Sequence, residues 1–415
     1  MDKFSRDGDG GRVTYLIVSQ GVNSINSRVK ELLSLVRQHG EGTLVGSGED
    51  WNKPGYISIK SYPNPTGILR ILGLNEVKRN IDKNLYFPSS DILYVRRAVN
   101  RLKRYIGRDI RAGKRVLLIT CVPHHVVALA GLYLKDKFPT LKWIVDWQDL
   151  WSYDENYFGR IPPVYRKKLL DTERRILETA DVNVTTNENA RNILIDKFGV
   201  PPQKVVAINH HFSQEDFDHG KAQERNEVTI GGGKAIKMGI LGNLFKPPRV
   251  PGEKLIDVLR AVRERTPNLE FHIYGDVTAA GKKAKLENKE PWLILHDRIP
   301  HKESLRAIAG CDFLLVLLAD LANCKVVLPQ KLPFYFKLGK PILAIVPEDS
   351  AVSQAIRETG TGYVIPSADD WASPLEEIFR DYQNGRTRMD RNEERIEAYS
   401  WENISKQWLR LIAGA

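Results

Sequence analysis

The feature that most constrains this chain is a series of short, almost continuous apolar runs separated by longer stretches with helical periodicity. A strand covered on both faces has an unbroken apolar sequence, and parallel strands need a crossover between them that is usually a helix. The pattern therefore predicts a parallel α/β sheet in the first half of the chain. Its expected strands are residues 12–19, 114–121, 141–146, 181–186 and 205–208.

The same alternation begins again after a polar stretch that contains three consecutive glycines, Gly231 to Gly233. The expected strands of the second half are residues 237–242, 270–275, 292–295, 312–318 and 340–346. At 415 residues the chain is long enough for two or three domains. We therefore predict two α/β domains followed by a helix. The expected bounds are 1–212 for the first domain, 213–236 for a linker, 237–395 for the second domain and 396–415 for the C-terminal helix.

Composition excludes several classes of protein. Three widely spaced cysteines do not make a disulfide scaffold or a zinc ribbon, and they fit a reducing compartment. The first twelve residues are hydrophilic, unlike a secretory signal peptide. No clean run of about 20 apolar residues suggests a transmembrane helix. We expect a cytoplasmic protein.

The net charge of +11 is concentrated in two basic clusters, Arg96–Arg115 and Arg166–Arg175. One interpretation is that both are solvated helix faces. The other is that they dock on an anionic membrane surface, which would place the protein peripherally on the inner face of the membrane. Nucleic acid is the least favoured partner, because no helix-turn-helix, RNA-recognition or zinc-finger signature accompanies the charge.

Five short segments occur in a fixed order along nearly the whole chain. They are Trp143–Trp151, Ile240–Leu244 followed by Arg249, Leu328–Tyr335 followed by Leu338–Leu343, Glu358–Gly362 followed by Val364–Pro366, and Tyr399–Trp401. Together these segments resemble glycosyltransferases of the GT-B fold, most closely glycosyltransferase family 4. The resemblance implies two Rossmann-like parallel-sheet domains that face each other across an interdomain cleft, with a C-terminal helix that crosses back to the first domain.

The implied activity is transfer of a sugar from a nucleotide-sugar to a hydroxyl of a saccharide or of a lipid-linked saccharide. In open parallel sheets, ligands bind beyond the carboxyl ends of the strands. The second domain would hold the donor and the first the acceptor. The nucleotide-sugar is a co-substrate, and no cofactor or metal is expected, since the donor site has no obvious metal-binding Asp-x-Asp motif.

Donor-binding candidates follow the strands of the second domain. A diphosphate leaving group needs cations, and Arg249 and Lys331 are the candidates, with backbone N–H groups at the Gly242 turn in support. The alternative for Arg249 is a surface arginine in a proline-rich loop. The alternative for Glu348 and Ser350, which follow the expected strand 340–346, is an exposed loop. The donor-binding set is Gly242, Asn243, Arg249, Lys331, Glu348 and Ser350.

Catalytic and acceptor-side candidates follow the strands of the first domain. His124 could contact the donor sugar or take a proton, although an isolated histidine pair in a loop is more often structural. Asp149 would be the general base if the enzyme inverts the anomeric centre, and its alternative role is a helix N-cap. The acceptor-side set is Gly21, Asn23, His125 and Trp151.

One departure from the family pattern leaves alternatives open. The family commonly places two glutamates around the lysine, whereas this chain has Val326 and Phe334 there. The nucleotide, the sugar and the stereochemistry therefore stay open. The alternatives are a non-catalytic GT-B-like protein that binds a glycan or a partner, and, with less support, a glycosyltransferase that modifies nucleic acid.

Overall fold

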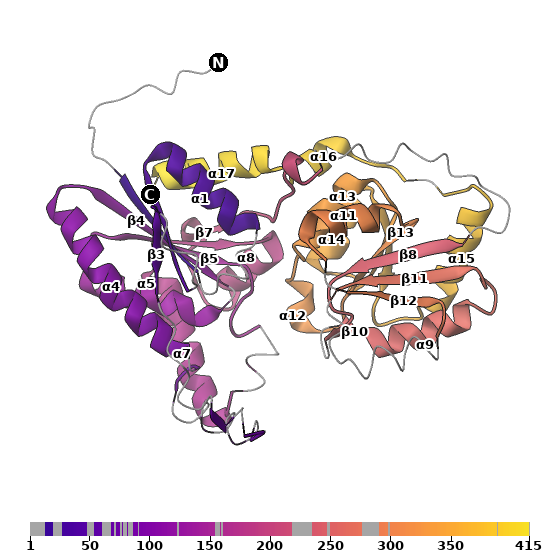
Figure 1. Ribbon diagram of the computed structural model, residues 1–415, viewed down its shortest axis with the longest axis horizontal. Helices are drawn as coiled ribbons and strands as arrows, with labels where there is room; N and C mark the ends of the chain where they lie inside the picture. Colours follow the sequence, from indigo (N-terminus) through magenta and orange to yellow (C-terminus); the bar gives the residue numbers. More distant parts are fainter. Residues whose placement is uncertain are drawn as a thin grey trace, which may run out of the picture. The chain divides into compact units, whose positions relative to one another are not determined.

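The computed structural model divides the chain into two compact units (Figure 1). Unit 1 comprises residues 1–186, 190–208 and 407–415, and unit 2 comprises residues 187–189 and 209–406. The described residues are 13–19, 27–47, 54–59, 68–69, 72–74, 77, 81, 86–89, 91–122, 124–153, 158, 161–217, 235–246, 250–275, 290–297, 299–387 and 389–414.

Unit 1 is built on a seven-stranded sheet with the order β3-β2-β1-β4-β5-β6-β7, in which all neighbouring strands are parallel. The central strands are mostly apolar and are buried after their first residue, as expected for a sheet covered on both faces. The strands are β1 (Val13–Val18), β2 (Glu41–Gly46), β3 (Tyr56–Ser58), β4 (Arg115–Val122), β5 (Lys142–Trp147), β6 (Val182–Thr185) and β7 (Val205–Ala207).

Helices cover both faces of this sheet (Figure 1): α4, α5 and α7 lie on one face, and α1 lies on the other. Among the described residues, no helix is both long enough and apolar enough to cross a membrane. The helices of this part of the chain are α1 (Ser27–His39), α4 (Ile92–Arg111), the 3₁₀ turn η3 (His125–Val127), α5 (Ala128–Lys137), α7 (Pro163–Thr179), α8 (Glu188–Asp196) and the 3₁₀ turn η4 (Pro202–Lys204).

Unit 2 contains a six-stranded parallel sheet with the order β12-β11-β8-β13-β14-β15 and a small antiparallel pair, β9 with β10. Its strands are β8 (Ile236–Leu241), β9 (Phe245–Lys246), β10 (Val250–Pro251), β11 (Leu269–Tyr274), β12 (Leu293–His296), β13 (Phe313–Leu317), β14 (Ile342–Val346) and β15 (Gly362–Pro366).

Two apolar cores lie on opposite faces of the second sheet. One core packs α9 and α15 against the sheet, and the other packs α11, α13 and α14 against it (Figure 1). The helices are η5 (Gln214–Asp216), α9 (Gly252–Val262), α11 (His301–Ala309), α12 (Ala322–Lys325), α13 (Lys331–Leu338), α14 (Ala351–Thr359), α15 (Ala372–Gln383), α16 (Glu393–Glu397) and α17 (Trp401–Gly414), whose last part belongs to unit 1.

A fully buried ion pair ties three elements of unit 1 together. Asp146 lies on β5, and its carboxylate accepts hydrogen bonds from Nε of Arg28 at 3.0 and 3.1 Å and from Nη2 at 2.8 Å. Arg28 belongs to the first turn of α1, and its guanidinium lies 5.2 Å from the ring centroid of Trp408 on α17. The pair therefore fixes the start of α1 and the end of the C-terminal helix on the sheet.

The predicted architecture of two parallel α/β sheets is confirmed, with strand limits that differ by one or two residues from the expected ones. The structure also contains β2, β3, β15 and the short pair β9 and β10, which were not predicted as strands. Gly362–Pro366, part of the fourth segment of the resemblance above, forms the edge strand β15. The first domain was predicted to end at residue 212. In the structure, residues 190–208 belong to unit 1 and unit 2 continues from residue 209. Residues 218–234 of the predicted linker lie outside the described residues.

The ion pair gives a direct test of this arrangement. We expect Asp146→Ala to lower the free energy of unfolding by about 3–5 kcal/mol, because it leaves the Arg28 guanidinium buried without a counter-charge. The double variant Arg28→Met with Asp146→Leu removes both charges and should lose less stability than the single variant. Urea unfolding of the three proteins provides the measurement. A single variant as stable as the wild type would contradict the assignment.

Candidate functional site

The strand orders locate one crevice in each sheet. In unit 1 the chain proceeds from β1 outward to β2 and β3, then returns to β4 on the other side of β1. In unit 2 it proceeds from β8 to β11 and β12, then returns to β13 on the other side of β8. Ligands of open α/β sheets bind at such switch points, outside the carboxyl ends of the strands. The candidate sites therefore lie beyond β1 and β4 in unit 1, and beyond β8 and β13 in unit 2.

The turn after β8 brings two glycine backbones into contact. Gly242 has a φ of 104°, which side chains disfavour, and its N–H donates to the carbonyl of Tyr274 at 2.9 Å. A Cβ atom on Gly275 would lie 2.4 Å from the Gly242 carbonyl oxygen, so glycine is needed there too. Gly242 and Asn243 are exposed. The turn therefore leaves bare backbone beside the switch point, where a ligand can approach closely.

Two residues of helix α13, one turn apart, form hydrogen bonds with the end of β8. Lys331, its first residue, points its Nζ at the carbonyl oxygens of Leu241 and Leu315, at 3.0 and 3.5 Å. The fully buried Tyr335 accepts a hydrogen bond from the Leu241 N–H at 2.9 Å. Because Leu241 ends β8 and Leu315 lies on β13, the ammonium sits at the switch point itself. Sequence reasoning had singled out Lys331 but not Tyr335.

The Lys331 ammonium is surrounded by backbone groups in the described part of the chain. Among the described residues, no ion pair includes this lysine, and its hydrogen bonds go to backbone carbonyls. Burial lowers the pKa of Lys331 to about 7, because the ammonium is desolvated without a counter-charge. An anionic group bound beside it would restore the charged form. The Lys331 ammonium and the Gly242 turn, both at the end of β8, together suit a phosphate-bearing ligand.

The other donor-side candidates lie at the end of β14 or outside the described residues. Ser350 is buried and caps α14, its hydroxyl accepting the Ser353 N–H at 3.1 Å. Glu348 is exposed, 3.3 Å from the guanidinium of Arg357. Arg249 lies outside the described residues. The roles of these three residues stay predictions.

The two positions that depart from the family pattern are apolar and buried. Val326 and Phe334 are 9% and 2% exposed. The Phe334 ring meets the His301 ring edge-on with centroids 4.9 Å apart, and His301 Nε2 lies 3.6 Å from a carboxylate oxygen of Asp216. A histidine–aspartate pair thus lies beside Phe334. Sequence reasoning missed it, because Asp216 and His301 are far apart in the chain.

In unit 1, two adjacent histidines follow β4 and adopt very different environments. His124 is exposed and has φ 77° and ψ 70°, a left-handed conformation that is rare outside glycine and frequent at functional sites. His125 is buried and stacks on Trp151 with ring centroids 5.7 Å apart. Its Nε2 lies 3.1 Å from the carbonyl oxygen of Asp149, which can only accept, so this nitrogen donates.

The structure thus brings three of the predicted residues together, since His125 joins the loop after β4 to Asp149 and Trp151 in the loop after β5. Trp151 is fully buried, whereas Asp149 is partly exposed. Gly21 and Asn23 lie outside the described residues. His125 and Trp151 therefore position the loop, and Asp149 and His124 are the two groups that solvent can reach.

A buried glutamate beneath this loop was missed by sequence reasoning. Glu173 on α7 is 1% exposed, and one of its carboxylate oxygens accepts the Ser152 N–H at 3.2 Å. The other carboxylate oxygen has no hydrogen-bond partner among the described residues. Burial raises the pKa of Glu173 to about 7, although hydrogen bonds from Ser152 and Trp151 oppose the shift. The signal was its spacing with Leu169, Ile176 and Leu177, the buried face of α7.

Comparison with known proteins agrees with this geometry. No protein-family model matches the chain. A curated protein described as the probable glycosyltransferase WbjE of Pseudomonas aeruginosa is 29% identical over 195 residues, which are 47% of this chain and 48% of that protein. The chain therefore spans about half the length of the curated relative it matches.

Two solved structures cover nearly the whole chain. Sucrose-phosphate synthase of Thermosynechococcus elongatus matches with a TM-score of 0.65 and 16% identity, over 97% of this chain and 100% of that chain. HepE of Anabaena, in complex with UDP-glucose, matches with a TM-score of 0.65 and 9% identity, over 97% of this chain and 100% of that chain. At these identities the likeness shows the fold. This protein has the GT-B fold.

Glu173 makes a testable contribution to stability. The pKa of a glutamate in the unfolded chain is about 4.3, so between about pH 4 and pH 7 the unfolded state loses this proton while the folded state keeps it. Stability should therefore fall as pH rises through this window, by an amount on the order of 3–4 kcal/mol. Glu173→Gln cannot ionise, so we expect it to be more stable than the wild type at pH 8, with the difference shrinking below pH 5.

Urea unfolding at several pH values measures this effect. Glu178→Gln, on the exposed last turn of the same helix, is the matched control and should leave the pH profile unchanged. Parallel pH profiles for the wild type and Glu173→Gln would show that the buried carboxyl does not titrate in this range.

Proposed function

We propose that this protein is a glycosyltransferase that moves a sugar from a nucleotide-sugar donor to a hydroxyl of a saccharide or lipid-linked saccharide acceptor. The observation that carries the proposal is Lys331, a partly buried ammonium at the β8/β13 switch point that has no acidic partner among the described residues and lies beside the bare backbone of the Gly242 turn. The WbjE relative and the UDP-glucose complex of HepE support it.

In this proposal the donor diphosphate binds against unit 2. Lys331 and the backbone at Gly242 and Asn243 stabilise the negative charge that develops on the departing nucleoside diphosphate. Such fixed donors contribute most where water is excluded, and the buried stem of Lys331 meets that condition. Arg249, Glu348 and Ser350 stay proposed as further donor contacts. The reaction needs no metal or other cofactor.

The acceptor hydroxyl is proposed to bind against unit 1. Asp149, held through its carbonyl by His125, is the proposed general base, and His124 is the proposed contact to the sugar. Gly21, Asn23, His125 and Trp151 form the proposed acceptor side. We further propose that the enzyme works in the cytoplasm, peripherally at the inner face of a membrane, where Arg96–Arg115 and Arg166–Arg175 contact anionic lipid.

The alternative is a non-catalytic GT-B-like protein that binds a glycan or a partner. The apolar Val326 and Phe334 favour it, because they remove the carboxylates that the family places around the lysine. It differs from the enzyme in one measurable respect, which is that no donor loses its nucleotide. A nucleic-acid-modifying glycosyltransferase is supported by the net charge alone.

A panel of UDP-, GDP-, dTDP-, ADP- and CMP-sugars tests the proposed donor. We expect one nucleotide class to raise the melting temperature clearly above the others, because a ligand that binds only the folded state stabilises it in proportion to its occupancy. The same donor should then release its nucleotide when an acceptor is added. No shift with any donor at millimolar concentration, together with binding of free glycans, would favour the non-catalytic alternative.

Lys331→Met tests the proposed donor site. We expect turnover at least tenfold lower, which corresponds to about 1.4 kcal/mol of transition-state stabilisation, with no loss of thermal stability because the variant removes a desolvated charge. Since the pKa of Lys331 is about 7, donor binding at pH 8 should take up a proton in the wild type. Calorimetry in buffers of different ionisation enthalpy measures that uptake, which the variant should lack.

Lys337→Met is the matched control. Lys337 lies on the same helix, but its ammonium pairs with Glu397 at 2.8 Å, so turnover and proton uptake should stay at wild-type values. Lys331→Met with wild-type turnover would remove Lys331 from the donor site. A large drop in melting temperature would instead indicate that the lysine mainly holds β8 and β13 together.

A further inference from the structure

Three helices of unit 1 form one outward layer that is rich in positive charge. Helix α5 lies between α4 and α7, and the contact to α7 includes an ion pair in which Nη2 of Arg175 lies 2.7 Å from a carboxylate oxygen of Asp136 (Figure 1). This layer contains the first basic cluster on α4 and the second on α7. The proposed donor and acceptor sites do not use any side chain of this layer's outer surface.

The outer face of α4 carries no acidic side chain that could balance its charge. The single acidic residue of α4, Asp109, is 3% exposed and accepts hydrogen bonds from Thr14 at 3.0 Å and Arg108 at 2.8 Å. Its carboxylate therefore makes its hydrogen bonds within unit 1 and does not balance the charge of the outer face. The apolar face of α4 is also buried against the sheet, so this helix offers only its charge to a partner. The seven basic residues of α4 are Arg96, Arg97, Arg101, Lys103, Arg104, Arg108 and Arg111.

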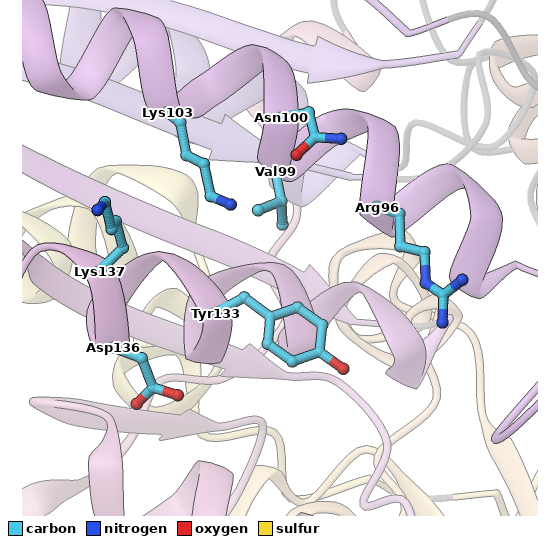
Figure 2. A pocket seen from close by; sticks show the side chains of 7 residues that line it. All are labelled: Arg96, Val99, Asn100, Lys103, Tyr133, Asp136 and Lys137. Carbon is cyan, nitrogen blue, oxygen red and sulfur yellow. The ribbon is translucent and has the colours of Figure 1, made fainter.

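A groove of about 510 Å³ opens between α4 and α5. Figure 2 shows Arg96, Asn100 and Lys103 extending from α4, with Val99 between them, and Tyr133 and Lys137 standing on α5 opposite. The spacing explains the arrangement, because residues four and seven apart on α4, and four apart on α5, share one helix face.

The groove has a net positive charge that the described residues leave unbalanced. Arg96, Lys103 and Lys137 have no ion-pair partner among the described residues, and all three are exposed. Asp136 is the one acid in the lining, and its carboxylate is already paired with Arg175. The amide of Asn100 adds a neutral donor. Three cations and an amide around one hollow complement a phosphate group.

Exposed apolar side chains occur in the same unit. Tyr133, in the groove, is 42% exposed, and Val164 and Leu170 on α7 are 76% and 38% exposed. Large exposed hydrophobic side chains among the described residues all belong to unit 1, and unit 2 has none. Aromatic rings and basic residues together are typical of surfaces at the membrane–water interface. The other large exposed hydrophobic side chains of unit 1 are Ile68, Leu72, Leu74 and Val77.

We propose that the α4–α5 groove binds the phosphate of an anionic phospholipid headgroup and that the layer of α4, α5 and α7 docks the protein on an anionic bilayer. A cluster of four to eight basic residues on one helix suits an anionic lipid surface, and α4 has seven. The exposed Tyr133, Val164 and Leu170 favour a bilayer over a nucleic acid, which offers no apolar phase. The proposal rests on the proposed function for its purpose, which is to bring the enzyme to a lipid-linked acceptor.

Vesicle flotation of the full-length protein tests the proposal without any nucleotide-sugar, so the docking proposal can fail separately from the proposed function. We expect the wild type to float with phosphatidylcholine vesicles that contain about 30% phosphatidylglycerol, and not with vesicles of pure phosphatidylcholine. The groove variant Arg96→Ala, Lys103→Ala, Lys137→Ala should partition at least tenfold more weakly, because each cation near an anionic surface contributes about a factor of five.

The matched control removes the same net charge from unit 2. Arg306→Ala, Arg380→Ala, Arg386→Ala changes three exposed arginines and should float like the wild type. Unchanged melting temperatures confirm that both variants fold. The proposal is overturned if the groove variant floats like the wild type, if the control loses as much binding as the groove variant, or if a DNA duplex at equal phosphate concentration is bound as tightly as the anionic vesicles.

Discussion

The fold of unit 1 depends on how a sheet buried on both faces accommodates a charge. Asp146 projects from β5 where no water reaches it, and an isolated carboxylate there would cost several kcal/mol. Arg28 supplies the counter-charge, and Trp408 covers the guanidinium. Arg28 belongs to α1 and Trp408 to α17. The need to neutralise Asp146 on β5 therefore fixes the first and the last described helix of the chain on the same sheet.

Lys331 and Glu173 are buried or partly buried and lack such compensation in the described part of the chain, and both border the candidate sites. Lys331 is held by carbonyl oxygens alone, and the second carboxylate oxygen of Glu173 has no partner among the described residues. Burial lowers the pKa of the lysine and raises that of the glutamate, and both reach about 7. An anionic ligand would complete the lysine's environment, whereas Glu173 on α7 stays buried and accepts the Ser152 N–H beside the loop that carries Asp149.

The sequence predicts the framework well and the interior of the sites poorly, for physical reasons. Long apolar runs identify the central strands, and the residues that follow them identify the switch points, so Gly242 and His125 were found. The strands β2 and β3 were missed because they are short or contain glycines, which have low strand propensity. Tyr335 and Glu173 form hydrogen bonds with segments far apart from them in the chain. No local sequence pattern predicts which residue such a side chain will contact.

The two positive sites of the molecule differ in burial, and this separates their behaviour. The Lys331 ammonium is desolvated, so its interaction with an anion depends on pH near neutrality and is weakly screened by salt. The cations of the α4–α5 groove are exposed, so their attraction for an anionic surface falls with ionic strength, because the Debye length is only about 8 Å at physiological salt. If both proposals hold, salt should act on docking and pH on donor binding, which would allow the two steps to be varied independently in one protein.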